Sequence, residues 1–193
     1  MKTALLVIDM QNICMGKNHA KMFQYDQIGL LNRINQRISE FEPKNVYYIK
    51  NVMKKNFLNR FAPFQAYEGM EETELVDGLN IVSDQIFSKY TGNAFTNLNF
   101  AEKIKKDGYE CVELVGVDGG GCVALTALGA IKLGYKVIIQ NNLVGTVMVK
   151  QEQKYRKKLI KKEQYIKRYS YNNVIKLIDI LRKDIFENLF VRA

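Results

Sequence analysis

Apolar segments of about eight residues alternate with segments of helical periodicity over roughly the first three-quarters of the chain. The apolar segments are residues 3–10, 45–52, 82–89, 111–118 and 135–142. Apart from residues 82–89, which are mostly polar, they hold runs of consecutive apolar residues rather than an apolar residue at every second position. Such runs are typical of strands covered on both faces, as in a parallel sheet.

Helical patterns lie between these strands, at residues 26–41, 96–106 and 122–133. In the first of them Ile28, Leu31, Ile34 and Ile38 fall on one face. Strands that alternate with helices predict right-handed βαβ units and an α/β domain with helices on both faces of the sheet. No repeat and no Pro/Gly-rich linker interrupts the chain, so we predict one domain over residues 1–193.

Two stretches depart from this alternation. Residues 53–80 are irregular, and a long loop inside a compact domain often has a function. After Val149 the pattern is almost wholly helical, and residues 171–191 carry apolar side chains at helical spacing. We therefore predict a helical C-terminal extension over about residues 147–193.

Composition places the chain among cytoplasmic proteins and excludes a membrane span. It is 47% hydrophobic and 25% charged, and no apolar run approaches the roughly 20 residues that span a bilayer. Asp9 interrupts the apolar N-terminal segment, which favours a buried first strand over a signal peptide. An odd, sparse set of three cysteines indicates a reducing compartment.

The net charge of +9 is concentrated in residues 150–168, where only Glu152 and Glu163 oppose nine basic residues. Such a segment could bind nucleic acid or another acidic partner. A solvated helix face or an oligomer contact is the favoured interpretation, and a third is positive charge supplied to a neighbouring subunit's pocket. The nine basic residues are Lys150, Lys154, Arg156, Lys157, Lys158, Lys161, Lys162, Lys167 and Arg168.

Three reactive side chains lie at or just beyond the carboxyl ends of predicted strands. Asp9 follows the first strand, Lys89 ends the third, and Cys122 follows the fourth after the turn GVDGGG. Ligands of open α/β sheets bind at this edge, so we expect the three to converge there. Each also has a structural interpretation, since Asp9 could cap a turn, Lys89 could be solvated and Cys122 could be a small core residue.

Together these residue types form a cysteine hydrolase site. A thiol attacks as a thiolate, which a helix N-terminus and a nearby lysine stabilise. A carboxylate can take the thiol proton and return it to a leaving amine. The glycines allow a sharp turn, which would aim backbone amides at one developing oxyanion.

Other kinds of functional site are excluded. The chain has no GxGxxG, GxxxxGK[ST], CxxC or HExxH motif, and its one histidine, His19, cannot form a His-rich metal site.

The chain resembles the isochorismatase-like cysteine hydrolases, which include nicotinamidases and N-carbamoyl amide hydrolases. The matching stretches are LLVIDMQN, FSKYTGNAF and LVGVDGGGCVALTALGAIKLGYKV, within about residues 3–145. The resemblance implies a three-layer α/β/α fold with a mostly parallel sheet, and the triad of Asp9 as general acid and base, Lys89 as the polarising group and Cys122 as nucleophile. It also implies a cis peptide at Val117–Asp118, whose turn presents the amides of Asp118 and Cys122 as an oxyanion hole.

Three departures from the family pattern bear on function. The family usually has threonine where Gly119 stands, and often where Leu98 stands. Metal-binding nicotinamidases carry an Asp-x-His signature after the second strand, where this chain has Asn51, Val52 and Met53. The segment after about residue 147 falls outside the resemblance.

These observations predict a metal-independent hydrolase without a cofactor, acting on a C–N bond of a small amide or ureido compound. Isochorismate hydrolysis does not need the cysteine, so Cys122 favours this substrate class. By position, Gln11, Phe23, Tyr90 and Phe95 are candidates to line the pocket, although the aromatic side chains could equally be core. Family members commonly form dimers and tetramers, and we expect the same here. The alternative is a non-catalytic scaffolding protein that acts through its basic C-terminal helix, an interpretation that Gly119 and Leu98 motivate.

Overall fold

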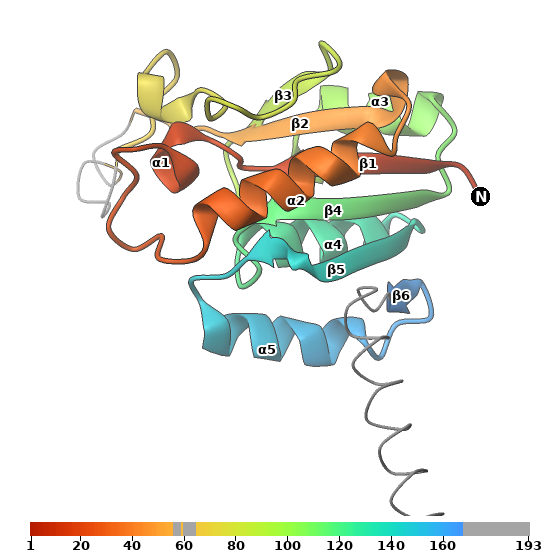
Figure 1. The fold of residues 1–193 in the computed structure, drawn as a ribbon. Coiled ribbons are helices and arrows are strands. Elements are labelled where there is room, and N and C mark those ends of the chain that lie inside the picture. The colour runs from red at the N-terminus through yellow and green to blue at the C-terminus, as the bar shows by residue number, and fades with distance from the viewer. Residues whose placement is uncertain (56–58, 60–64, 168–193) are drawn as a thin grey trace, which may run out of the picture.

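A six-stranded parallel sheet forms the centre of the protein in a computed structural model, which describes residues 1–55, 59 and 65–167. The strand order is β3-β2-β1-β4-β5-β6, and every neighbouring pair is parallel (Figure 1). The strands are β1 (Thr3–Ile8), β2 (Val46–Asn51), β3 (Ile86–Lys89), β4 (Cys111–Val117), β5 (Lys136–Gly145) and β6 (Tyr165–Lys167). Five of the strands lie within or overlap the apolar segments of the sequence.

Helices cover both faces of the sheet and complete three layers, which confirms the predicted α/β/α class. α2 (Gln27–Ser39) packs on one face through Leu30, Ile34 and Ile38. α3 (Leu98–Lys106) and α4 (Cys122–Lys132) pack on the other face. A single turn, α1 (Asn12–Met15), follows β1, and α5 (Val149–Leu159) packs beside α4 (Figure 1).

The alternation of side chains along the strands divides them between two apolar clusters. In β2, Val46 and Tyr48 point toward α2, whereas Tyr47 and Ile49 point toward α3 and α4. The last residue of the strand, Asn51, therefore shares the face of α3 and α4. The register pairs Asn51 with Lys89 of β3, which consequently points to the same side.

The region after residue 147 confirms one part of the prediction for this segment and corrects another. α5 confirms a helix there, but Tyr165–Lys167 is a strand, so a helical assignment is wrong for these residues. β6 pairs with β5 and supplies partners for backbone groups that would otherwise lie along an open edge. A strand of three residues is too short to show a hydrophobic periodicity. Its formation depends on the neighbouring strand, so the sequence pattern could not predict it. The helix expected at residues 171–191 lies outside the described residues.

A buried ion pair ties α2 to the centre of the sheet. Glu113 of β4 is fully buried, and Arg37 donates to its two carboxylate oxygens at 2.8 and 2.7 Å. Gln140 of β5 donates to one of the same oxygens at 2.8 Å. The carboxylate thus has three hydrogen bonds, which offset the cost of burying its charge.

Candidate active site

The structure brings Asp9, Lys89 and Cys122 together at the carboxyl edge of the sheet. The Nζ atom of Lys89 lies 2.9 Å from Oδ2 of Asp9 and 3.1 Å from Sγ of Cys122. Lys89 reaches across from the edge strand β3 and is only 1% exposed. The predicted convergence of the three side chains is therefore present in the fold.

Asp9 is held in an unusual conformation and retains an unused acceptor. Its φ of 51° lies in the left-handed region, which aspartate tolerates better than most residues. Its backbone N–H donates to the carbonyl of Ile49, and Oδ2 accepts from Lys89. Oδ1 is buried and accepts no hydrogen bond of normal geometry from a described residue, although the Cys122 thiol lies near enough to lower the pKa of the carboxyl group. A buried carboxylate oxygen without a donor is costly, and it is free to accept a proton.

Asn51 is a site residue that sequence reasoning missed. Its Oδ1 accepts a hydrogen bond from Lys89 Nζ at 3.2 Å, so the ammonium group contacts Asp9, Cys122 and Asn51. The signal that could have found it is the alternation Tyr47, Ile49, Asn51, which carries the side chain to the face where α4 begins. Without the register of β2 against β3, however, an asparagine at a strand end is typical of an ordinary turn.

Gln11, a candidate pocket residue, instead supports Asn51. It is fully buried, and its Oε1 accepts from the backbone N–H of Asn51 at 2.7 Å. Its Nε2 donates to the carbonyls of Asn51 at 3.1 Å and of Thr73 at 2.7 Å. Gln11 thus ties the end of β2 to the segment around Thr73, and its side chain acts on the site through Asn51.

The turn before α4 leaves two amides available. The Val117–Asp118 peptide is cis, as the resemblance predicts. Within the turn, the amides of Gly119, Gly120 and Gly121 donate to the Gly145 carbonyl, the Asp118 carboxylate and the Asp118 carbonyl, respectively. The backbone N–H groups of Asp118 and Cys122 make no hydrogen bond to any described residue. These are the two amides that the resemblance assigns to an oxyanion hole.

Two of the three glycines of this turn, Gly119 and Gly120, are needed for space. Neither has a positive φ, so a left-handed backbone does not explain them. A Cβ added at Gly120 would lie 2.2 Å from the carbonyl oxygen of Met148, and one at Gly119 would lie 2.4 Å from Oγ1 of Thr146. The hydroxyl of Thr146 therefore occupies the position that a side chain at residue 119 would need. This explains why glycine stands where the family usually has threonine.

The Asp118 side chain binds the same loop to the turn. One carboxylate oxygen accepts from the amides of Gly120 at 3.1 Å and Val147 at 3.0 Å, and the other accepts from Met148 at 3.3 Å. The loop between β5 and α5 thereby fixes the backbone that leads into Cys122.

Burial and mutual charge set the protonation of the site. Desolvation raises the pKa of Asp9, against the opposing effects of Lys89 and the nearby Cys122 thiol. Desolvation and the Asp9 carboxylate raise the pKa of Cys122 to about 12, although Lys89 opposes the shift. For Lys89, desolvation lowers the pKa, but Asp9 and Cys122 outweigh it and the net shift is upward. At neutral pH the resting site therefore holds a thiol beside an ammonium group and a carboxyl group of raised pKa.

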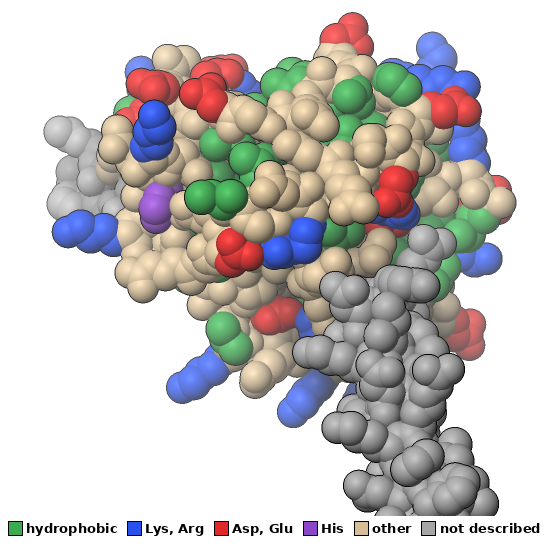
Figure 2. Space-filling model, viewed as in Figure 1, with side chains coloured by type: hydrophobic (Ala, Val, Ile, Leu, Met, Phe, Trp, Pro, Cys, Tyr) green, Lys and Arg blue, Asp and Glu red, His purple; other side chains and the backbone are tan. Residues whose placement is uncertain are grey.

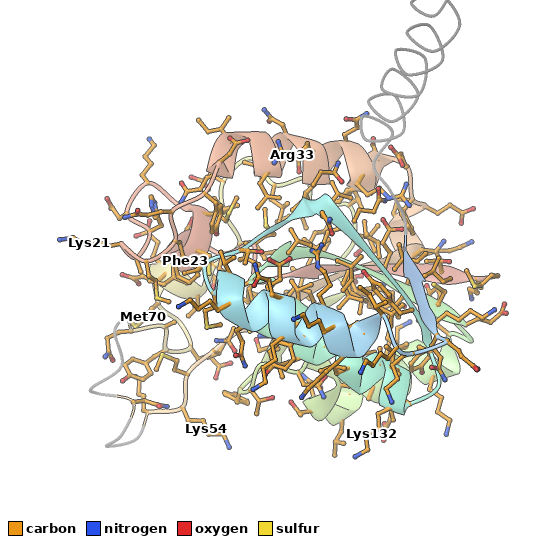
Figure 3. All side chains as sticks on the ribbon, turned by 90° about the horizontal axis from the view of Figure 1, so that it is seen from below. Lys21, Phe23, Arg33, Lys54, Met70 and Lys132 are labelled. Atoms are coloured by element: carbon orange, nitrogen blue, oxygen red, sulfur yellow. The ribbon has the colours of Figure 1, made fainter. Side chains whose placement is uncertain are left out.

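The aromatic pocket candidates differ in exposure. Phe23 and Phe95 are buried in the two apolar clusters, on opposite faces of the sheet, which favours a core role for both. Phe23 lies on the same side of the molecule as Lys21 and Met70 (Figure 3). Tyr90 follows Lys89 and is 49% exposed, with Lys54 Nζ 5.3 Å from its ring centroid. Only Tyr90 has an accessible ring, and its role in a pocket stays a prediction.

The residues at the end of β2 do not fit a metal ion. Oδ1 of Asn51 already accepts from the ammonium group of Lys89, and Met53 stands where the nicotinamidase signature has histidine. Across residues 1–55, 59 and 65–167, no three His, Cys, Asp or Glu side chains form a group that could hold a metal. We therefore derive no chemical step through a metal.

The basic segment lies on α5 and the turn after it. Arg156 bonds Glu152 and Asn141, whereas the lysines at 150, 154, 157, 158, 161 and 162 are exposed. Blue side chains project from the lower rim of the molecule, where α5 lies (Figure 2). Arg168 lies outside the described residues, and binding of an acidic partner here stays a prediction. No helix in the described part of the chain is long and apolar enough to cross a membrane.

Comparison with known proteins identifies a family and solved structures that share this fold. The family model described as "Isochorismatase domain" matches residues 3–166, so the similarity extends beyond the boundary near residue 147 expected from the motifs. No curated protein matches the chain in sequence. Many solved structures share the fold, at low sequence identity.

Three of these structures are described by their sequence identity, TM-score and coverage. Pyrazinamidase of Pyrococcus horikoshii in complex with zinc is 21% identical, with a TM-score of 0.73, and the match covers 88% of this chain and 99% of that one. N-carbamoylsarcosine amidase from Thermoplasma acidophilum is 19% identical, with a TM-score of 0.73 and coverages of 89% and 98%. PnC1 from L. infantum in complex with nicotinate is 20% identical, with a TM-score of 0.74 and coverages of 86% and 96%.

Proposed function

Because the chain belongs to the isochorismatase domain family, we propose that it is a cysteine hydrolase of small amide or ureido compounds. The observation that carries the proposal is the contact of one ammonium group, Lys89 Nζ, with both Asp9 and Cys122 beside an unpartnered oxygen of Asp9. A structural ion pair has no need of a thiol or of a vacant acceptor. A nucleophile with its base needs both.

In the first step Asp9 acts as general base. Its carboxylate takes the proton from Sγ of Cys122 while the sulfur attacks the carbonyl carbon of the substrate. The raised pKa of Asp9 makes it a stronger base than an exposed carboxylate, and this suits a thiol whose own pKa is about 12. Lys89 stays protonated and stabilises the negative charge as it moves from oxygen to sulfur.

The tetrahedral intermediate carries its negative charge on the former carbonyl oxygen. The amides of Asp118 and Cys122 are the donors for this oxyanion, since the other amides of the turn are already engaged. Collapse of the intermediate breaks the C–N bond, and protonated Asp9 gives its proton to the departing ammonia or amine. Water then attacks the thioester with Asp9 again as base, which releases the acid and restores the thiol.

The names of the structural neighbours support an amide or ureido substrate. Pyrazinamidase, nicotinamidase and N-carbamoylsarcosine amidase are named for reactions at C–N bonds. Independence from metal is part of the proposal, because the donor groups at the end of β2 are an amide engaged by Lys89 and a methionine. Assembly into dimers or tetramers and a cytoplasmic setting remain predictions.

A screen of small amides and ureido compounds, with ammonia release as the readout, tests the function. We expect at least one compound to be hydrolysed by the wild-type protein in the presence of a chelator. Turnover should be lost in Cys122→Ala, Asp9→Asn and Lys89→Met.

Ammonia release that persists in Cys122→Ala would contradict the proposed mechanism. No turnover of any compound, together with salt-sensitive binding of nucleic acid that depends on the α5 lysines, would favour the scaffolding alternative instead.

A further inference from the structure

Asn51 occupies a position from which it can hold the ammonium group of Lys89. It is the last residue of β2, and its partner in the register with β3 is Lys89 itself. Paired residues on parallel strands point to the same face, which here is the face where α4 begins. The register of β2 and β3 therefore places Asn51 Oδ1 within hydrogen-bond distance of Lys89 Nζ, at 3.2 Å.

The count of hydrogen bonds around Lys89 shows what Asn51 contributes. An ammonium group has three donors, and the structure gives it three acceptors: Asp9 Oδ2, Cys122 Sγ and Asn51 Oδ1. Because Lys89 is 1% exposed, water cannot replace a missing acceptor at low cost. The three acceptors define one orientation in which the ammonium group lies between the carboxylate and the thiol.

The backbone of Asn51 is fixed as firmly as its side chain. Gln11 accepts from its N–H at 2.7 Å and donates to its carbonyl at 3.1 Å. Gln11 is in turn anchored to the carbonyl of Thr73 at 2.7 Å. Because the backbone of Asn51 is already fixed, only its side-chain torsions remain to be ordered by the contact with Lys89.

We propose that Asn51 is a positioning residue of the reaction, which holds the Lys89 ammonium group between Asp9 and Cys122 without adding a negative charge. The proposal rests on the proposed function. An amide oxygen accepts a hydrogen bond as a carboxylate does, but it leaves the charges of the site at one carboxylate and one ammonium group. A second carboxylate would disfavour the thiolate that must form during attack.

The groups that act on the thiol come from several elements. Asp9 lies at the end of β1, and Lys89 lies at the end of β3. Cys14 of α1 lies close enough to Asp9, Lys89 and Asp118 for their charges to affect the pKa of its thiol. Substitution of Asn51 leaves each of these groups in the sequence, so a change in the titration of Cys122 reports on the loss of Asn51 and on the movement of Lys89 that follows from it.

The experiment is site-resolved alkylation of Cys122 by iodoacetamide, followed by peptide mass mapping, over about pH 6 to pH 9. The variants are Asn51→Asp, which changes one atom and adds a charge, and Asn51→Leu, which removes the acceptor. The matched control is Gln140→Leu, because Gln140 is also a strand amide beside a buried ion pair but contacts Glu113. Thermal unfolding checks that each variant is folded.

We expect the rate at Cys122 to fall about tenfold at neutral pH in Asn51→Asp, with the pH profile displaced upward by about one unit. Asn51→Leu should lower the rate by several-fold, and Gln140→Leu should leave it unchanged. Wild-type rates and profiles in both Asn51 variants would overturn the proposal. The readout needs no substrate, so failure of the amide screen and failure of this inference can be told apart.

Discussion

Two buried ion pairs bridge elements of this fold, and they differ in what surrounds the charges. The carboxylate of Glu113 has three hydrogen bonds, from Arg37 and Gln140. The Asp9–Lys89 pair is as deeply buried, yet one oxygen of Asp9 has no donor among the described residues, and the lysine also contacts a thiol. The first pair is complete, whereas the second lacks one hydrogen bond.

The difference separates a structural role from a chemical one. Both carboxylate oxygens of Glu113 accept hydrogen bonds, so neither is available to take a proton from another group. Such a pair can only hold elements of the fold together. An incomplete pair stores an unfavourable interaction that a proton or a substrate can relieve. Each of the four predictions below changes one of the two pairs.

The largest expected effect is on catalysis. Lys89→Met should lower ammonia release from the best substrate of the screen at least about a thousandfold, because it removes the charge that stabilises the thiolate. Arg37→Met should retain wild-type turnover per folded molecule, because Arg37 has no contact with the site residues. Equal losses in the two variants would show that both pairs act only through the fold.

The next effect is on stability. Arg37→Met should lower the free energy of unfolding by about 3 kcal/mol, because it removes the cation that pairs with the buried carboxylate of Glu113. The double variant Arg37→Met/Glu113→Leu should regain much of this loss, since the uncompensated charge is gone. Urea denaturation measures both, and a double variant no more stable than the single one would contradict the explanation.

A smaller effect appears in alkaline solution, and it is specific to the pair that includes a thiol. The pKa of Cys122 is raised from 9.0 to about 12, so above pH 9.0 the unfolded chain releases a proton that the native thiol retains. The stabilisation associated with the protonated native thiol is complete below pH 9.0 and is lost as the pH rises toward 12. Relative to Cys122→Ala, the wild type should lose up to about 1.4 kcal/mol of stability per pH unit in this window.

Urea denaturation at a series of alkaline pH values provides this comparison. All other titrating groups are shared by the two proteins, so the contributions of those that do not contact Cys122 cancel. Parallel pH profiles for the wild type and Cys122→Ala would show that the thiol titrates normally in the native protein.

The smallest effect belongs to Gln140. Gln140→Leu removes one of three hydrogen bonds to Glu113 and should cost about 1 kcal/mol of unfolding free energy. The remaining bonds from Arg37 keep the carboxylate paired. A loss as large as that of Arg37→Met would mean that the amide, rather than the charge, keeps Glu113 buried.

The sequence predicted the parts of the site that follow from strand ends. Asp9, Lys89 and Cys122 each lie at or just beyond the carboxyl end of an apolar run, and in a parallel sheet these ends share one edge. The apolar segments predicted five of the six strands. The signal is strongest for β1, β2 and β4, because nearly all of their residues are buried.

What could not be predicted depends on contacts between distant segments. Asn51 becomes a site residue only through its register with Lys89. The glycines at 119 and 120 are explained by Thr146 and Met148, which come more than 20 residues later and approach within about 2.4 Å of the missing Cβ atoms. β6 forms because β5 offers a strand edge, and no pattern within residues 165–167 reveals that pairing.

The most direct test of the account is the alkylation rate of Cys122, measured beside those of Cys14 and Cys111 in the same sample at neutral pH. Cys14 and Cys111 are buried, whereas Cys122 is partly exposed beside Asp9 and Lys89. We predict that Cys122 reacts at least about tenfold faster than either, because it is the more accessible thiol and has a base beside it. Asp9→Asn should remove most of this advantage, because an amide cannot take the thiol proton, and this loss outweighs the lower thiol pKa expected without the Asp9 charge. Equal rates at the three thiols, or a Cys122 rate unaffected by Asp9→Asn, would contradict its assignment as an activated nucleophile.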